Sequence, residues 1–418
     1  MKKKLIYLII IVTIVIIFIS LIPNKEIKEE EKDTPINTDT SIPRIYIEGD
    51  TLEIKEKDDI KNITLKYVSE ELEFESYATI KWQGNSSLRF KKKNYNIKLY
   101  SDENREEKYK VDTGWGNEYK YCLKANFIDQ THARNIITAS LSADIQKKYN
   151  LFENTPNYGV IDGFPVEVYN NNEFLGLYTW NIPKDEWLLG LDKNNINHIA
   201  IMPKEHEGEN YSAYDSYDVN TDWEFEAGHE QSINKFNRVL KFIIDSNNEE
   251  FKTNFEKYFN LDATLNYYVL LEMAMLIDNV DRNIIMVTYD GNIWYPTHYD
   301  LDISWGTNWT GLRTHRYTTD IETYFKGNLF FIKFRDNFKK EIANRYFELR
   351  KDIFTKDYIL NKFEDFSKLI PETSIQKEKE RWYELRGYDY NQISSFLDTR
   401  IPLIDKKMNT YLEEKWKQ

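Results

Sequence analysis

Oxygen-bearing side chains occur at both ends of one predicted β-hairpin. Its two apolar strands, 284–289 and 292–299, are joined by Asp-Gly, a dipeptide typical of a two-residue turn. The ends of a hairpin lie side by side, so we expect four side chains to converge on one edge: Asp278, Asn283, Asp300 and Asp302. Carboxylate and amide oxygens are ligands that Mg²⁺ and Mn²⁺ prefer. The spacing therefore predicts a divalent-metal site.

The order of these residues also suits phosphoryl transfer. That reaction needs a metal ion to neutralise phosphate charge, and one further group that orients the attacking hydroxyl or accepts its proton. Protein kinases have an Asp, four residues, an Asn, a hairpin and a metal-binding Asp in succession. Asp278, Asn283 and Asp300 follow the same order. The competing interpretation is that these residues only cap helices and end strands.

A second polar segment precedes a run of lysines. The loop Gly84-Asn85-Ser86-Ser87 lies between two predicted strands, and Lys91, Lys92 and Lys93 follow it. Backbone N–H groups, hydroxyls and nearby positive charge can cradle phosphate oxygens. The loop lacks the spacing of a Walker motif. A plain turn followed by a solvated basic strand remains the alternative.

The segments around these candidate site residues predict strands in the first part of the chain and helices in the later part. Five β-branched or aromatic segments are predicted strands: 45–47, 63–68, 78–82, 95–100 and 119–124. A helix is predicted from near Thr131, then a β-hairpin over 164–180 and a long loop over 204–230, after which helical periodicity dominates. This order indicates an α+β fold. We expect a β-rich lobe over about 44–200 and a helix-rich lobe over about 201–418.

The amino terminus carries a membrane signal. Three lysines precede an uncharged apolar run over 5–22, which is long enough to span a bilayer as a helix. A cleaved signal peptide is the main alternative, although Ile19-Ser20-Leu21-Ile22-Pro23 is a poor cleavage context. We expect a single-pass anchor at 1–22, a flexible linker at 23–43, and the remaining domain on the extracellular side.

Composition excludes several classes of function. The chain has 418 residues and a formal net charge of −13, which argues against a nucleic-acid binder. A single cysteine, Cys122, can form neither an internal disulfide nor a multi-cysteine zinc site. The six histidines show no zinc-protease spacing, and no Gly-x-Ser-x-Gly elbow is present. The sequence therefore favours chemistry based on carboxylates and lysines.

Four separated motifs resemble the spore-coat CotH protein-kinase family. They are the Gly-Asn-Ser-Ser turn, the Lys-Lys-x-Tyr-x-Ile-Lys strand, Leu123–Asp129 leading to Arg134-Asn135, and Asp300-Leu301-Asp302 with Gly306. The similarity spans about 44–400. It implies an atypical, bilobal protein-kinase fold that uses ATP and Mg²⁺ or Mn²⁺ to phosphorylate serines. It also implies a Ser-rich coat or surface protein as the substrate.

The resemblance also implies roles for individual residues. Asp278 corresponds to the catalytic Asp, and Asn283 and Asp300 to metal ligands, with Asp302 as a helper. The loop Gly84–Ser87 would contact the nucleotide. Lys92 is the first choice for the phosphate-binding lysine, with Lys93 and Lys98 as rivals. Asp129 and Arg134 would orient the interface between the lobes.

Three positions depart from the family pattern. Asn181 occupies a place where the family often has a glutamate, and Tyr299 replaces the usual Trp before the metal-binding Asp. Asp281 is an extra acid that could serve as the base in place of Asp278. Asn181 favours an alternative, a catalytically inactive kinase-like binding or adhesion protein. A glycosidase with a carboxylate pair is a third hypothesis, but it gives no role to the lysine-rich loop.

Overall fold

The computed structural model describes residues 42–204 and 212–414. The chain divides into two units, 1–38 and 39–418, and every described residue belongs to the second. The predicted anchor at 1–22, and nearly all of the predicted linker, lie outside the described residues. Among the helices that the structure describes, none is both long enough and apolar enough to cross a bilayer.

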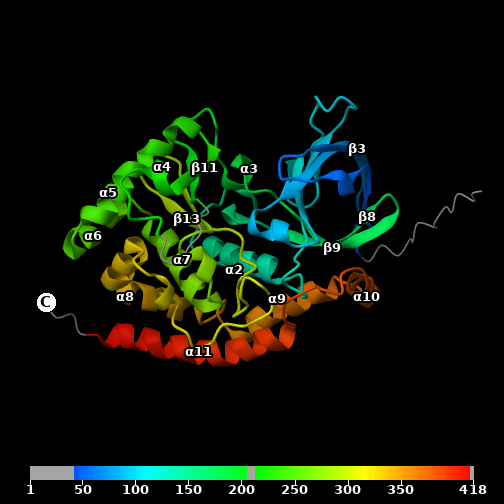
Figure 1. Ribbon diagram of the computed structural model, residues 1–418. Coiled ribbons are helices and arrows are strands. Elements are labelled where there is room, and N and C mark those ends of the chain that lie inside the picture. Colours follow the sequence, from blue (N-terminus) through cyan, green and yellow to red (C-terminus); the bar gives the residue numbers. More distant parts are fainter. Residues whose placement is uncertain (1–41, 205–211, 415–418) are drawn as a thin grey trace, which may run out of the picture. The chain divides into compact units, whose positions relative to one another are not determined.

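A closed seven-stranded barrel forms the amino-terminal half of the described chain (Figure 1). Around the barrel the strands are β1 (Arg44–Glu48), β2 (Lys61–Val68), β3 (Glu73–Gln83), β4 (Asn94–Tyr100), β7 (Lys120–Lys124), β9 (Glu173–Asn181) and β8 (Gly163–Asn170). The closing pair, β1 with β8, is parallel, and the other neighbours are antiparallel. Closure leaves no free strand edge on the barrel.

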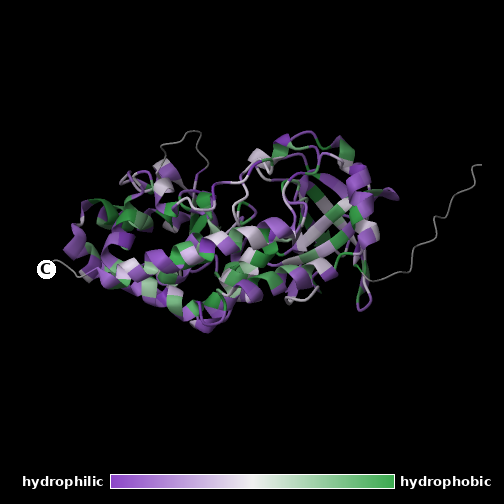
Figure 2. Cartoon of the chain, turned by 90° about the horizontal axis from the view of Figure 1, so that it is seen from below, coloured by the Kyte–Doolittle hydropathy of each residue, from purple (hydrophilic) through white to green (hydrophobic). Residues whose placement is uncertain are grey.

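Alternating hydrophobicity explains why these segments form a barrel. Along β2, Ile63, Leu65 and Tyr67 are buried while the residues between them are more accessible. In a strand such alternate residues point to one face, so the apolar ones fill the barrel interior. Figure 2 shows the resulting bands of hydrophobic and hydrophilic residues along the barrel strands.

A second sheet lies within the carboxyl-terminal half. It has four antiparallel strands in the order β11 (Trp223–Gly228), β10 (Ile199–Pro203), β12 (Ile284–Thr288) and β13 (Tyr295–His298). The sequence predicted a long loop over 204–230, and this was wrong for β11, which pairs with β10. The predicted return strand at 292–299 is also shorter than expected, because Asp290 bonds the backbone N–H groups of Asn292 and Ile293 and holds them in the turn.

Helices make up most of the remaining described chain. The α-helices are α2 (Arg134–Lys148), α3 (Glu186–Leu189), α4 (Val219–Asp222), α5 (Asn237–Asp245), α6 (Asn248–Asn254), α7 (Leu261–Ala274), α8 (Leu329–Leu349), α9 (Lys356–Lys368), α10 (Glu372–Arg381) and α11 (Tyr390–Glu413). A short hairpin, β5 (Val111–Asp112) with β6 (Asn117–Glu118), completes the strands described. The prediction of a mixed α+β protein is confirmed.

Two helices connect the halves of the fold. Helix α2 follows the barrel strand β7 but packs against α7 and α9, and it is buried over most of its length. Helix α10 returns from the carboxyl-terminal part of the chain and packs on β9 (Figure 1). The barrel and the helical half are therefore joined by packing as well as by the chain itself.

Candidate functional site

A cavity of about 1020 Å³ lies where the barrel meets the second sheet. Its barrel side is formed by the Gly84–Ser87 loop and by residues of β3, β4 and β7, and its other side by residues near β10, β11 and the β12–β13 hairpin. The four residues predicted to converge at the hairpin all line this cavity: Asp278, Asn283, Asp300 and Asp302. Residues more than 200 positions apart in the sequence thus face the same space.

Backbone hydrogen bonds hold the two ends of the hairpin together. The Tyr299 N–H donates to the carbonyl of Asn283 at 3.1 Å. The side-chain amide of Asn279 donates to the carbonyls of both Asn283 and Tyr299, at 3.0 and 2.9 Å. Asn279 is buried, and its own carbonyl accepts from the Tyr267 hydroxyl at 2.6 Å. Sequence analysis missed Asn279, which fixes the distance between the two acidic segments.

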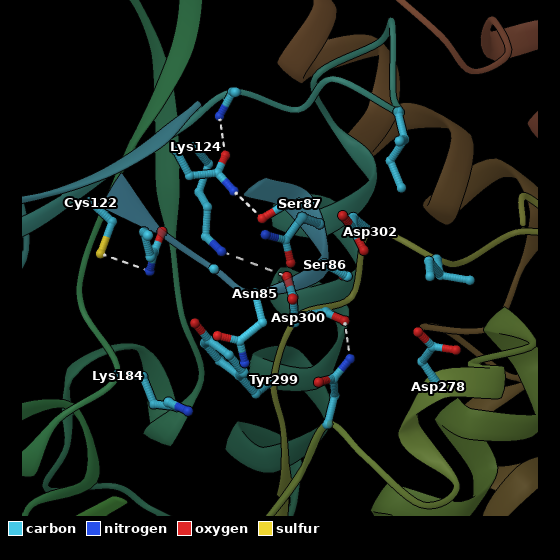
Figure 3. Close-up of a pocket in the computed structure, with 18 of the residues that line it drawn as sticks. Asn85, Ser86, Ser87, Cys122, Lys124, Lys184, Asp278, Tyr299, Asp300 and Asp302 are labelled. Atoms are coloured by element: carbon cyan, nitrogen blue, oxygen red, sulfur yellow. Dashed lines mark hydrogen bonds and ion pairs between the residues drawn. The ribbon is translucent and has the colours of Figure 1, made fainter. Parts of the chain in front are cut away.

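Helix α2 also holds the segment Asp300-Leu301-Asp302 in place. The Asn135 side-chain oxygen accepts from the Leu301 N–H at 2.9 Å, and Leu301 is fully buried. Since Leu301 points into the core, the two aspartates that flank it can face the cavity. Figure 3 shows Asp300 and Asp302 on one side of the cavity and Asp278 across from them.

The electrostatics of the site favour a bound cation. Burial, followed by the charges of Asp300, Asp278 and Asp129, raises the pKa of Asp302 well above its usual range, while Lys124 acts in the opposite direction. Within residues 42–204 and 212–414, Asp302 makes no hydrogen bond or ion pair. A half-buried carboxylate near other acids costs free energy unless a cation or proton compensates its charge.

The carboxylates of Asp278, Asp300 and Asp302 are not close enough together to surround a metal ion by themselves. In the described part of the chain, one group of three acidic side chains has oxygens that all lie within 4.8 Å of one another: Glu272, Asp320 and Glu322. Lys407 already compensates that group, with its Nζ 2.6 Å from Glu272 and 2.5 Å from Glu322. A cation between Asp278, Asp300 and Asp302 would thus draw further oxygens from Asn283, water or a ligand.

The lysine that reaches the acidic segment is Lys124, at the end of β7. Its Nζ lies 3.7 Å from an oxygen of Asp300 (Figure 3). Burial opposes the charge of Lys124, but Asp300 and its neighbours outweigh that effect and raise the pKa of Lys124 above its usual range. Lys124 is therefore positively charged at neutral pH and lines the cavity.

Lys92, the predicted phosphate lysine, is engaged elsewhere. Its side chain is fully buried and its Nζ bonds Glu378 at 2.7 Å and the carbonyl of Ala125 at 2.8 Å. It also donates to the carbonyl of Leu177, so all three ammonium protons have acceptors. Lys92 borders the cavity, but its ammonium points to α10, where the buried carboxylate of Glu378 compensates its charge.

The two rival lysines do not line the cavity. Lys93 donates to the carbonyl of Leu88 and lies over the Trp82 ring, and Lys98 is exposed on β4. Alternation along β4 separates Lys98 from the buried Ile97 and Leu99, so its side chain points out of the barrel.

The Gly84–Ser87 loop does face the cavity. All four residues line it, and the first turn after Gly84 is a short 3-10 helix, Ser86–Arg89. Asn94 ties this loop to β7, because its oxygen accepts from the Ala125 N–H at 2.7 Å and its amide donates to the Ser87 hydroxyl at 3.3 Å. The loop is thus held beside Lys124.

The structure separates the roles of Asp278 and Asp281. Asp278 lines the cavity, whereas Asp281 does not and instead accepts from the buried Asn328 amide at 2.7 Å. Burial raises the pKa of Asp281 to about 7. Asn328 is the N-cap residue of α8, so this hydrogen bond ties the segment that precedes β12 to the start of α8, and Asp281 has a structural role.

Asp129 and Arg134 form a buried ion pair at the start of α2. Arg134 is fully buried and also donates to the carbonyl of Tyr388 at 3.0 Å and to the Gln392 side chain at 2.8 Å. The pair therefore joins α2 to the beginning of α11, and Asp129 lies close enough to Asp302 to affect its pKa.

Asn181 and Tyr299 occupy different environments. Asn181 is buried against Gly163 on β8 and does not line the cavity. The acid that pairs with the buried Lys92 is Glu378, nearly 200 positions later, so a glutamate at position 181 is not needed for that pair. Tyr299 lines the cavity, and Lys184 lies over its ring at 4.3 Å.

Comparison with known proteins agrees with this arrangement of motifs. The family model described as CotH kinase protein matches residues 80–403, a span that includes the Gly84–Ser87 loop, Lys124 and the whole acidic hairpin. No curated protein matches the chain. Since the match covers most of the sequence and includes every residue that lines the cavity except Lys57, the chain belongs to the CotH kinase protein family.

Proposed function

We propose that the protein is an atypical protein kinase that transfers the γ-phosphoryl group of ATP to a serine or threonine hydroxyl. The substrate hydroxyl oxygen would bond to the γ-phosphorus as the bond to the β–γ bridging oxygen breaks, which releases ADP and the hydroxyl proton. The observation that carries this proposal is the single cavity that gathers four oxygen ligands, a hydroxyl-rich loop and Lys124 from separate elements.

The residues of the cavity suit different parts of this reaction. Asn283, Asp300 and Asp302 offer oxygen ligands for Mg²⁺ or Mn²⁺, which would neutralise phosphate charge. The uncompensated carboxylate of Asp302 supports a cation there. Asp278, across the cavity, would orient the substrate hydroxyl and accept its proton. Lys124 and the Gly84–Ser87 loop would hold the phosphates.

The lobes, the membrane anchor and the protein substrate complete the proposed function. The barrel and the helical half would act as the two lobes of a kinase-like fold, with nucleotide between them. The apolar run at 5–22 would anchor the protein in a membrane with the domain on the extracellular side. The substrate would be a Ser-rich coat or surface protein, and the acidic net charge makes nucleic acid an unsuitable partner.

Phosphate incorporation measures the proposed activity directly. The full-length chain, purified in detergent, is incubated with labelled ATP and either Mg²⁺ or Mn²⁺, and label is counted on the protein and on a Ser-rich peptide. Asp302→Asn and Asp300→Asn keep the side-chain shape but remove the charge. We expect each to reduce transfer by about a hundredfold or more, because charge stabilisation in an active site has effects of that size.

Asp365→Asn is the matched control, because Asp365 is an exposed helix residue outside the cavity. It should retain full transfer. Transfer that survives both Asp300→Asn and Asp302→Asn would disprove the metal-binding role. Binding of ATP without any transfer in the unmodified chain would instead support the inactive binding protein.

A further inference from the structure

An exposed apolar rim borders the mouth of the cavity. Trp309 is 54% exposed and lines the cavity, and Leu312, three residues later, is 59% exposed. Leu312 does not line the cavity itself, but large apolar side chains that are exposed close together on one segment, and not scattered singly, often mark an interaction site. The two residues belong to the segment Thr307–Thr314, which begins five residues after Asp302, the end of the acidic Asp-Leu-Asp segment.

The backbone of this segment is held rigidly in place. Thr307 and Thr314 form a bridge, and the Asn308 N–H donates to the carbonyl of Arg313 at 3.1 Å. The Gly311 carbonyl accepts from the Gly387 N–H at 2.8 Å, and the Tyr388 hydroxyl donates to the Leu312 carbonyl at 3.1 Å. Trp309 and Leu312 are thus exposed on a segment that is tied down, so their exposure is built into the fold.

Close packing beneath the segment explains why it cannot turn its apolar side chains inward. An added Cβ at Gly311 would lie 2.8 Å from the Ile128 carbonyl oxygen, so a side chain there would force the segment away. The Arg89 guanidinium lies over the Trp309 ring at 5.0 Å and holds the indole at the mouth of the cavity. The result is one fixed aromatic surface at the cavity that Asp278 also lines.

The charge around the rim differs from that of the chain as a whole. The net charge is −13, yet Arg313 and Arg316 are exposed and, within the described residues, neither forms an ion pair with a carboxylate. Two arginines without partners in an acidic protein are available to an acidic ligand. Both follow Leu312 in the sequence, one and four residues later, so apolar and basic groups share one short stretch of the chain.

We propose that the Thr307–Thr314 rim and Arg316 bind the acceptor segment of the protein substrate. That segment would contain the acceptor serine or threonine, an apolar residue that packs on Trp309 and Leu312, and acidic residues that pair with Arg313 and Arg316. This inference rests on the proposed function and specifies its substrate class. Trp309 and the two arginines are binding residues, whereas Asp278 acts on the acceptor hydroxyl.

Peptide kinetics and peptide binding test this proposal. Peptides with one central serine carry acidic or basic flanks, and leucine or alanine at each position near the serine. The unmodified chain should favour acidic peptides that contain leucine. Trp309→Ala should raise the peptide KM about tenfold, equal to about 1.4 kcal/mol of binding free energy, and should leave the KM for ATP unchanged. Arg313→Glu/Arg316→Glu should remove the preference for acidic peptides.

Two controls match these variants. Leu369→Ala shortens another exposed apolar residue, and Lys351→Glu/Lys406→Glu makes the same charge change away from the cavity. Both should behave like the unmodified chain. An unchanged peptide KM in Trp309→Ala, or an acidic preference that survives the arginine changes, would overturn the proposal while leaving the kinase activity intact.

A binding measurement separates the two proposals. Anisotropy of a labelled acidic peptide reports binding without any transfer. Peptide binding that depends on Trp309 in a chain that transfers no phosphate would support the rim and contradict the kinase activity. Phosphate transfer by a chain whose peptide binding does not depend on Trp309 would support the kinase activity and contradict the rim. Circular dichroism of each variant identifies any loss of folding.

Discussion

At the scale of single residues, the environment of each lysine decides what it can do. Lys92 is surrounded by three acceptors, Lys98 points into solvent, and Lys124 lies 3.7 Å from Asp300. Of these three, only Lys124 combines a maintained positive charge with an ammonium group directed at the acidic side of the cavity. The side chain that best suits phosphate oxygens is thus the last residue of β7.

Lys124→Met tests this assignment. We expect it to raise the KM for ATP or lower kcat by about ten- to hundredfold in the phosphate-incorporation assay, because a charge-assisted hydrogen bond contributes about 1.5–3 kcal/mol. Lys98→Met is the control, and it should have no effect because Lys98 is exposed on β4. Equal losses in the two variants would show that neither lysine has a specific role.

At the scale of elements, α10 is attached to the barrel by a buried ion pair. Glu378 accepts from Lys92 at 2.7 Å and from the Leu177 N–H on β9 at 2.7 Å. Gly176 makes this contact possible, because an added Cβ would lie 2.9 Å from both Lys92 Cε and Trp382 Nε1. Lys92, a residue that lines the cavity, is therefore held by a helix from the distant stretch Glu372–Arg381.

Removing one partner of this ion pair should destabilise the fold more than removing both. In Glu378→Gln the Lys92 ammonium loses its counter-ion; burial already lowers the pKa of Lys92, while Glu378 raises it. We expect a loss of about 3–5 kcal/mol in the free energy of unfolding, as for other broken buried pairs. Lys92→Met/Glu378→Leu should recover part of that loss, as measured by urea denaturation.

The double variant is the decisive comparison. If it were less stable than Glu378→Gln, the charge of the pair would not be the cause of the destabilisation. Lys91→Met serves as a control, because the ion pair of Lys91 with Glu384 is solvent-exposed and such pairs contribute about 0–1 kcal/mol.

At the scale of the whole described unit, the cavity is lined by elements from both the barrel and the carboxyl-terminal half, and each half has its own hydrophobic core. One core fills the barrel, and a larger one lies among α2, α7, α8, α9 and α11. A ligand that contacts both sides of the cavity binds the folded chain and not the unfolded chain, so it must stabilise folding.

Nucleotide with metal should therefore raise the melting temperature. At a ligand concentration of about 100 Kd the expected gain in free energy of unfolding is about 2.7 kcal/mol. Mg·ATP should produce this shift in scanning calorimetry of the unmodified chain, ATP with a chelator should produce less, and Asp302→Asn should reduce the effect of Mg²⁺. An identical shift in the variant would place the metal elsewhere.

The sequence by itself determined the order of the motifs and the local geometry of the hairpin. The Asp-Gly turn and the apolar strands on either side were enough to predict that Asp278, Asn283, Asp300 and Asp302 face one space. The four residues are close in the sequence, so the alternation of side chains along the strands and the geometry of the turn determine where they lie relative to one another.

Only the tertiary structure decided which distant groups complete the site. The pairing of Lys92 with Glu378 depends on how α10 packs on the barrel, and the position of Trp309 next to Arg89 depends on how the Thr307–Thr314 segment packs. A lysine ammonium can reach several partners within a few ångströms of its backbone. Burial and the nearest acceptor decide which partner the ammonium binds. The spacing of residues along the chain gives no information about either.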